Sequence, residues 1–67
     1  MELFRERLKE ARLDKGFHQE QLAELLGVKR RTVSAWETGP NEPSVAMIIE
    51  ICRVLECDPN FLFGFDD

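Results

Sequence analysis

The apolar residues of this chain recur at helical spacings. Between residues 2 and 15, Phe4, Leu8 and Ala11 stand four and three apart, and most of the positions around them are charged. Such spacing puts the three side chains on one side of a helix. Because Gly16 is a good helix terminator, we expect an amphipathic helix over residues 2–15 with one buried side.

The stretch QEQLAELLGVKRRTVSAW, residues 19–36, predicts two short helices joined by a tight turn. Its apolar residues form pairs at helical spacing, Leu22 with Leu26 and Val33 with Trp36. Gly27 stands between the pairs, and glycine tolerates the left-handed backbone that ends a helix. Ala23 is small enough to let a second helix cross closely. We therefore expect helices over residues 19–26 and 30–38 that meet at a steep angle.

The remainder of the chain predicts a loop and a fourth helix. Gly39 and two prolines make residues 38–43 a loop. Ser44 is a suitable N-cap for a helix over residues 45–56. The apolar stripe of this helix is broad, so the helix is expected to be largely buried; the stripe contains Val45, Met47, Ile48, Ile51, Cys52, Val54 and Leu55.

A short fifth helix should follow, capped by Asp58, with Pro59 in its first turn and Gly64 after its end. The segment FLFGF carries more phenylalanine than so short a helix can bury, so Phe63 or Phe65 is expected in an exposed apolar patch. Such a patch would contribute to a symmetric dimer. A tail folded back onto its own chain is the alternative.

Length and composition bound the fold class. Sixty-seven residues with 43% apolar content make one small domain, residues 1–67, and the helical periodicity makes it all-α. No apolar run exceeds the five residues VAMII, which argues against a membrane span or a secretory signal. Cys52 and Cys57, five apart in a helical pattern, are expected on different faces as reduced core or half-buried thiols.

Charge is unevenly distributed along the chain. The net charge is −4, which by itself disfavours a nucleic-acid ligand. Residues 40–67 hold Arg53 as their one basic residue against six acidic ones, whereas Lys29, Arg30 and Arg31 are consecutive. This separation can orient the protein on a polyanion and predicts weak non-specific DNA binding.

Several spaced strings carry a resemblance to a known family. From LKEAR through GFHQEQLAELLGV, RRTVSAWETG, EPS and DPNFLFG, residues 7–64 resemble the Cro/repressor-like helix-turn-helix domains, the xenobiotic-response-element-type transcriptional regulators. The resemblance implies a compact five-helix DNA-binding domain. Its helix-turn-helix core would be residues 19–38, and its third helix would enter the major groove.

The resemblance carries DNA-contact roles onto the outward face of the third helix. Arg30 and Arg31 would read bases, since arginine suits bidentate recognition of guanine O6 and N7. Ala35 would make an apolar contact such as one to a thymine methyl, and Ser34 would reach a base or a phosphate. A solvated basic patch is the alternative for the arginines.

Phosphate contacts are implied around that helix. Gln19 begins the second helix, where free N–H groups favour an anion, and Lys29 would reach phosphate as a point charge. The loop has no basic residue, so Asn41 or backbone N–H groups would serve there. His18 replaces the usual capping residue. It lies either near phosphate or in a solvent-facing loop with no special role.

The family pattern also implies an ion pair. Arg12 falls beside the apolar stripe of the first helix, and Glu37 stands where related domains hold its partner. We expect the two to pair and to be partly buried. An exposed arginine in a charged helix is the alternative.

These observations favour sequence-specific binding of double-stranded DNA by a prokaryotic or phage transcriptional regulator. We expect a cytoplasmic repressor that acts as a homodimer on an inverted-repeat operator. A protein-interaction module, antitoxin-like or an anti-repressor partner, is the alternative. Catalysis is not expected, because nucleophilic constellations and phosphate-binding glycine loops are missing from the sequence, and neither a cofactor nor a metal ion is expected.

Overall fold

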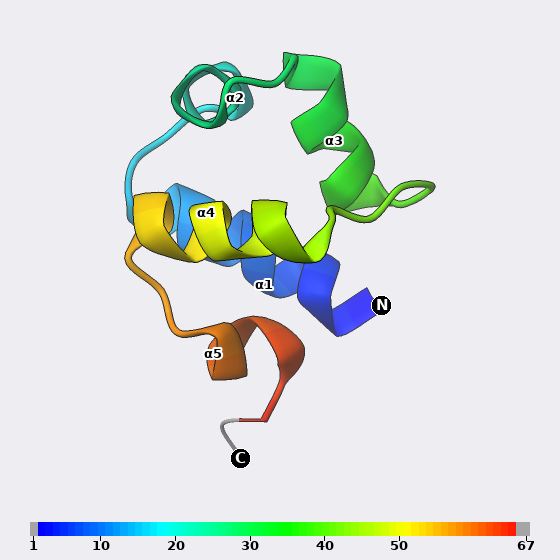
Figure 1. Cartoon of the computed structure of the whole chain (residues 1–67), viewed down its shortest axis with the longest axis vertical. Helices are drawn as coiled ribbons and strands as arrows, with labels where there is room; N and C mark the ends of the chain where they lie inside the picture. Colours follow the sequence, from blue (N-terminus) through cyan, green and yellow to red (C-terminus); the bar gives the residue numbers. More distant parts are fainter. Residues whose placement is uncertain (1, 66–67) are drawn as a thin grey trace.

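The computed structural model describes residues 2–65, and within them the chain forms five helices and no strand. The helices are α1 (Glu2–Asp14), α2 (Gln19–Leu26), α3 (Arg30–Thr38), α4 (Val45–Leu55) and α5 (Pro59–Phe63). In Figure 1, α2 and α3 lie at one end of the molecule, α5 at the other, and α1 and α4 between them. The predicted all-α, five-helix architecture is confirmed.

The core lies where α1 meets α3 and α5, and where α2 meets α3 and α4. Five apolar side chains are completely buried there, namely Leu8, Leu22, Val33, Ile51 and Leu62. Trp36 is 4% exposed, so its indole packs in the core and is not available to stack on a base. The apolar spacings of α1, α2 and α3 predicted these contacts correctly.

The turn between α2 and α3 has the expected geometry. Gly27 adopts a left-handed conformation with φ 73°. The N–H of Val28 then donates to the carbonyl of Ala23 over 2.9 Å, which satisfies an end of α2. Ala23 is 2% exposed beneath the crossing of the two helices. This turn sets the angle at which α3 leaves the body of the protein.

Two predicted helix ends were wrong by one residue. α1 ends at Asp14 because the N–H of Phe17 bonds the carbonyl of Arg12 over 3.1 Å, which turns the chain earlier than Gly16 alone required. α4 ends at Leu55 because Glu56 adopts the left-handed conformation, with φ 52°, that usually selects glycine. At the other ends, Ser44 and Asp58 cap α4 and α5 as predicted.

The prediction that α4 is largely buried was wrong. Of its residues only Ile51 and Leu55 are fully buried, whereas Val45 is 76% exposed and Ile49 is 53% exposed. The apolar stripe of this helix is wider than the surface that α2 and α5 offer to it. The described part of the chain therefore leaves an apolar strip of α4 open to solvent.

The prediction that the two cysteines lie on different faces of one helix was also wrong. Because α4 ends before Cys57, the chain turns back and the backbone N–H of Cys57 donates to the carbonyl of Cys52 over 3.1 Å. Both cysteines are free and half-buried, and their thiols interact. Burial is the main reason that the pKa of Cys57 rises to about 11.

The phenylalanines after α4 divide between core and surface. The ring of Phe63 stacks on that of Phe4 with centroids 5.7 Å apart, and Arg7 lies over the ring of Phe61 at 4.5 Å. Phe65 is 76% exposed, with its ring 6.5 Å from that of Phe63. Within residues 2–65, no helix is long and apolar enough to cross a membrane.

Candidate nucleic-acid interface

A buried ion pair joins the first and third helices. Arg12 Nε donates to Glu37 Oε2 over 2.7 Å, and Arg12 Nη2 donates to Glu37 Oε1 over 3.0 Å. The two side chains are 6% and 1% exposed, so the pair is more deeply buried than the sequence suggested. Arg12 Nη1 also donates to the carbonyl of Phe17 over 2.7 Å, which ties in the turn before α2.

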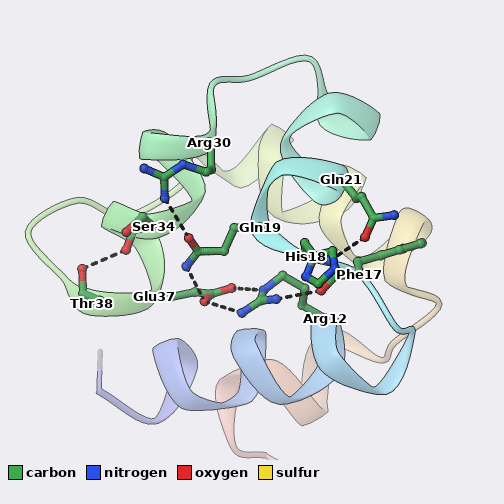
Figure 2. Close-up of polar contacts among 9 residues, drawn as sticks. All are labelled: Arg12, Phe17, His18, Gln19, Gln21, Arg30, Ser34, Glu37 and Thr38. Carbon is green, nitrogen blue, oxygen red and sulfur yellow. Dashed lines mark hydrogen bonds and ion pairs between the residues drawn. The ribbon is translucent and has the colours of Figure 1, made fainter.

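The ion pair continues as a chain of hydrogen bonds to the surface of α3. Gln19 Nε2 donates to Glu37 Oε1 over 3.1 Å, and Arg30 Nη1 donates to Gln19 Oε1 over 3.2 Å. Figure 2 shows the four side chains joined one to the next, from Arg12 through Glu37 and Gln19 to Arg30. The direction of the Arg30 guanidinium is therefore linked, through the side chains of Gln19 and Glu37, to the buried Arg12 of α1.

The side chain of Gln19 is engaged within the protein. Both ends of its amide are engaged inside the protein, so the side chain links Glu37 to Arg30. Its backbone N–H remains one of the first-turn donors that a helix cannot satisfy internally. Any anion at the start of α2 would therefore meet backbone N–H groups of the first turn, including that of Gln19, and not the Gln19 side chain.

His18 positions the start of α2 through its backbone. Its N–H donates to Gln21 Oε1 over 2.7 Å, which is the returning half of a capping box (Figure 2). His18 adopts an extended backbone, with φ −74° and ψ 161°, as an N-cap residue should. The start of α2 has no Ser, Thr, Asp or Asn as its N-cap residue. Gln21 stabilises this helix start instead, by accepting the hydrogen bond from His18.

The predicted base-reading residues lie on the outward face of α3. Arg30 and Arg31 are exposed, while Ser34 and Ala35 are half-buried on the same helix. Thr38 Oγ1 donates to the carbonyl of Ser34 over 2.8 Å, which closes the last turn. The inward side of α3 is occupied by core residues, so its other side is the one that can face a ligand.

The predicted phosphate-binding residues lie at both ends of α3. Lys29 is the exposed N-cap residue and does not cap with its side chain. Asn41 is exposed in the loop that follows α3. The structure thus brings Gln19 and Arg30 into direct contact, with Lys29 next to Arg30 in the chain, and leaves Asn41 beyond the opposite end of α3.

Two features of this face were missed by the sequence analysis. The bond between Gln19 and Arg30 depends on the angle between two helices, which spacing does not define. Arg5 of α1 lies against the loop at Gly39. Its position seven residues before Arg12, two turns along the same side of α1, was a signal that could have found it.

The chain is similar to proteins that regulate transcription. Residues 8–62 match the family model described as helix-turn-helix. An uncharacterized HTH-type transcriptional regulator of Archaeoglobus fulgidus is 40% identical over 63 residues, covering 94% of this chain and 90% of that protein. The SPbeta prophage-derived HTH-type transcriptional regulator YonR of Bacillus subtilis is 33% identical over 60 residues, covering 90% of this chain. This chain spans 56% of the length of YonR.

A solved structure is similar in both fold and sequence. The restriction-modification controller protein C.AhdI from Aeromonas hydrophila superposes with a TM-score of 0.82 and is 38% identical. The superposition covers 90% of this chain and 87% of that protein. The likeness therefore extends over nearly the whole five-helix arrangement.

Proposed function

The chain belongs to the helix-turn-helix family of DNA-binding domains, and from this premise we propose that it regulates transcription by sequence-specific binding of double-stranded DNA. In the proposed complex α3 lies in the major groove, and α2 crosses the backbone beside it. The observation that carries the proposal is the hydrogen-bond chain that links Arg30 to Glu37.

That chain favours base reading over a diffuse positive surface. A guanidinium has five N–H donors, and the Arg30–Gln19 bond uses one of its terminal nitrogens. The remaining donors are directed by a buried anchor, so less side-chain freedom is lost when they bond to guanine. We assign base contacts to Arg30 and Arg31, with Ser34 and Ala35 completing the face.

Phosphate contacts would hold the protein in register. The backbone N–H groups at the start of α2, including that of Gln19, suit a phosphate. Lys29 would add a point charge before α3, and Asn41 would bond the backbone from the loop after it. These contacts would carry affinity and little sequence information.

We propose that the protein acts as a homodimer and a repressor. Two copies related by a two-fold axis would address half-sites about 34 Å apart, so the operator would be an inverted repeat. Phe65, which is 76% exposed, and the open strip of α4 would supply apolar surface for the second copy. A dimer on such an operator would exclude polymerase, in the cytoplasm of a prokaryotic host, without any catalytic step.

The second candidate function is a protein-interaction module, and the exposed Phe65 is the observation that favours it. Selection of bound duplexes from a random DNA pool separates the two functions. An enriched inverted repeat supports DNA regulation by a dimer. A pool without enrichment contradicts that function and leaves the interaction module.

A further inference from the structure

An arginine from α1 lies across the loop that follows α3. A Cβ atom added to Gly39 would stand 3.0 Å from Arg5 Nε, 3.2 Å from Arg5 Cζ and 3.3 Å from Arg5 Nη2. Gly39 has φ 92°, so the loop needs glycine for its backbone as well as for this close approach. The guanidinium group of Arg5 therefore packs against the chain at Gly39.

Arg5 has no carboxylate partner among the described residues, unlike two other arginines of the chain. Arg12 pairs with Glu37, and Arg53 pairs with Glu50. The Nε atom of Arg5 is buried and makes no hydrogen bond to the described residues. Burying a charged N–H group without an acceptor costs free energy in a folded protein. An anion bound to the other N–H groups of the Arg5 guanidinium would offset that cost.

The position of Arg5 is one where DNA phosphate would be expected. A helix in the major groove brings the segments at its ends close to the phosphates that border the groove. The loop over residues 38–43 is such a segment, and it contains no lysine or arginine of its own. In Figure 1 the start of α1 and this loop lie at the same edge of the molecule.

We propose that Arg5 binds a DNA phosphate beside the C-terminal end of α3, and so supplies from α1 the positive charge that the loop lacks. This inference rests on the proposed DNA-binding function and adds a contact to it. Because Arg5 comes from a helix that does not read bases, its contact carries affinity and orientation without sequence preference.

The test uses Arg5→Gln and Arg5→Lys, with Arg53→Gln as the matched control. The control also removes one arginine charge, but from an exposed pair in the last turn of α4, at the opposite edge of the molecule in Figure 1. Binding of the selected operator and of an unrelated duplex is measured at several salt concentrations. Melting followed by circular dichroism checks that every variant is folded.

Loss of one phosphate contact has a defined signature. For Arg5→Gln, the slope of log K against log salt should fall by about 0.9 for each bound copy, and both duplexes should lose about the same factor in affinity, roughly 3- to 10-fold. Arg5→Lys should restore the slope because it restores the charge, and Arg53→Gln should leave it unchanged. The base preferences should be those of the unmodified protein in every variant.

Three other outcomes would overturn the proposal. An unchanged slope in folded Arg5→Gln, with base preferences still dependent on Arg30 and Arg31, would remove Arg5 from the DNA contacts and leave the proposed function standing. A slope that falls equally in Arg53→Gln would show a general charge effect. If the unmodified protein selects no operator, the proposed function fails first, and the Arg5 contact fails with it.

Discussion

Arg12 and Glu37 stand 25 residues apart in the chain and meet through two N–H···O bonds of 2.7 and 3.0 Å, in a site from which water is almost excluded. The pair fixes α3 to α1 below the face that we assign to DNA. Since Glu37 Oε1 also accepts a bond from Gln19, the same carboxylate supports the fold and the orientation of Arg30.

Removing the Glu37 carboxylate should strongly destabilise the protein. Glu37→Ala leaves the Arg12 guanidinium buried without its counter-charge, which should cost about 3–5 kcal/mol of unfolding free energy. Urea unfolding measures this loss. Glu50→Ala is the control, because it breaks an exposed pair whose side chains are 48% and 71% exposed and should cost about 0–1 kcal/mol. Equal losses in the two variants would refute a structural role for the buried pair.

Gln19 should be coupled to Arg30 in DNA binding. Gln19→Ala removes the link between Glu37 and Arg30, and a double-mutant cycle with Arg30→Ala should give a coupling of about 0.5–1.5 kcal/mol in operator affinity. Gln21→Ala is the matched control, because Gln21 bonds the N–H of His18 at the same helix start. Additive effects of Gln19→Ala and Arg30→Ala would mean that the observed bond does not orient the arginine.

The thiol of Cys57 should react slowly in the folded protein. Burial, with a smaller contribution from Cys52, raises its pKa from 9.0 to about 11, so little thiolate is present at neutral pH. Alkylation by iodoacetamide should accelerate about tenfold for each pH unit up to about pH 11. In Cys52→Ser, the neighbouring charge is gone and the acceleration should level off at a lower pH. A native rate equal to that of the urea-unfolded chain would contradict a buried thiol.

The same shift affects stability in alkaline solution. The thiol of Cys57 has a lower pKa in the unfolded chain than in the folded protein, so the folded state binds the proton more tightly. The free energy of unfolding therefore decreases as pH rises and the unfolded thiol loses its proton. The contribution of Cys57 to stability is thus fully present below about pH 9 and is lost between about pH 9 and pH 11. Cys57→Ala should flatten the decline over that window in unfolding experiments.

Phe65 should contribute to self-association. Phe65→Asp replaces an exposed ring with a charge, and if that ring lies in the dimer interface the variant should shift sedimentation toward the monomer without lowering the melting temperature. Leu13→Asp is a control at another exposed apolar residue, on α1. An unchanged association state in Phe65→Asp would exclude the Phe-rich end as the dimer contact.

The sequence predicted most of the fold because its local signals agree with one another. In α2 and α3 the apolar pairs, Ala23 and Gly27 all support the same two helices, and both sets of bounds were correct. Spacing was a poorer guide in α4. Periodicity identifies which side chains can be buried, whereas burial depends on what covers them, and no described element covers Val45 or Ile49.

The candidate site was only partly predictable for a related reason. Family resemblance implied the Arg12–Glu37 pair, and helical spacing placed Arg30 and Arg31 on the outward side of α3. The hydrogen-bond chain from Glu37 through Gln19 to Arg30 depends on how α2 and α3 cross. The position of Arg5 depends on the path of the loop at Gly39. Both are consequences of tertiary geometry, and only for Arg5 did the sequence hold a signal, which was its place two turns before Arg12 on α1.

The most direct test of base reading by α3 is a comparison of operator preferences among Arg30→Ala, Arg31→Ala and the unmodified protein, each selected from the same random duplex pool. We predict an inverted repeat in which each variant loses preference at its own base pair, at a cost of about 1–3 kcal/mol, and keeps it elsewhere. The contrary result is an operator whose preferences are unchanged in both variants, or a loss spread evenly over all positions. Either would mean that these arginines hold phosphates and that another part of the protein reads the sequence.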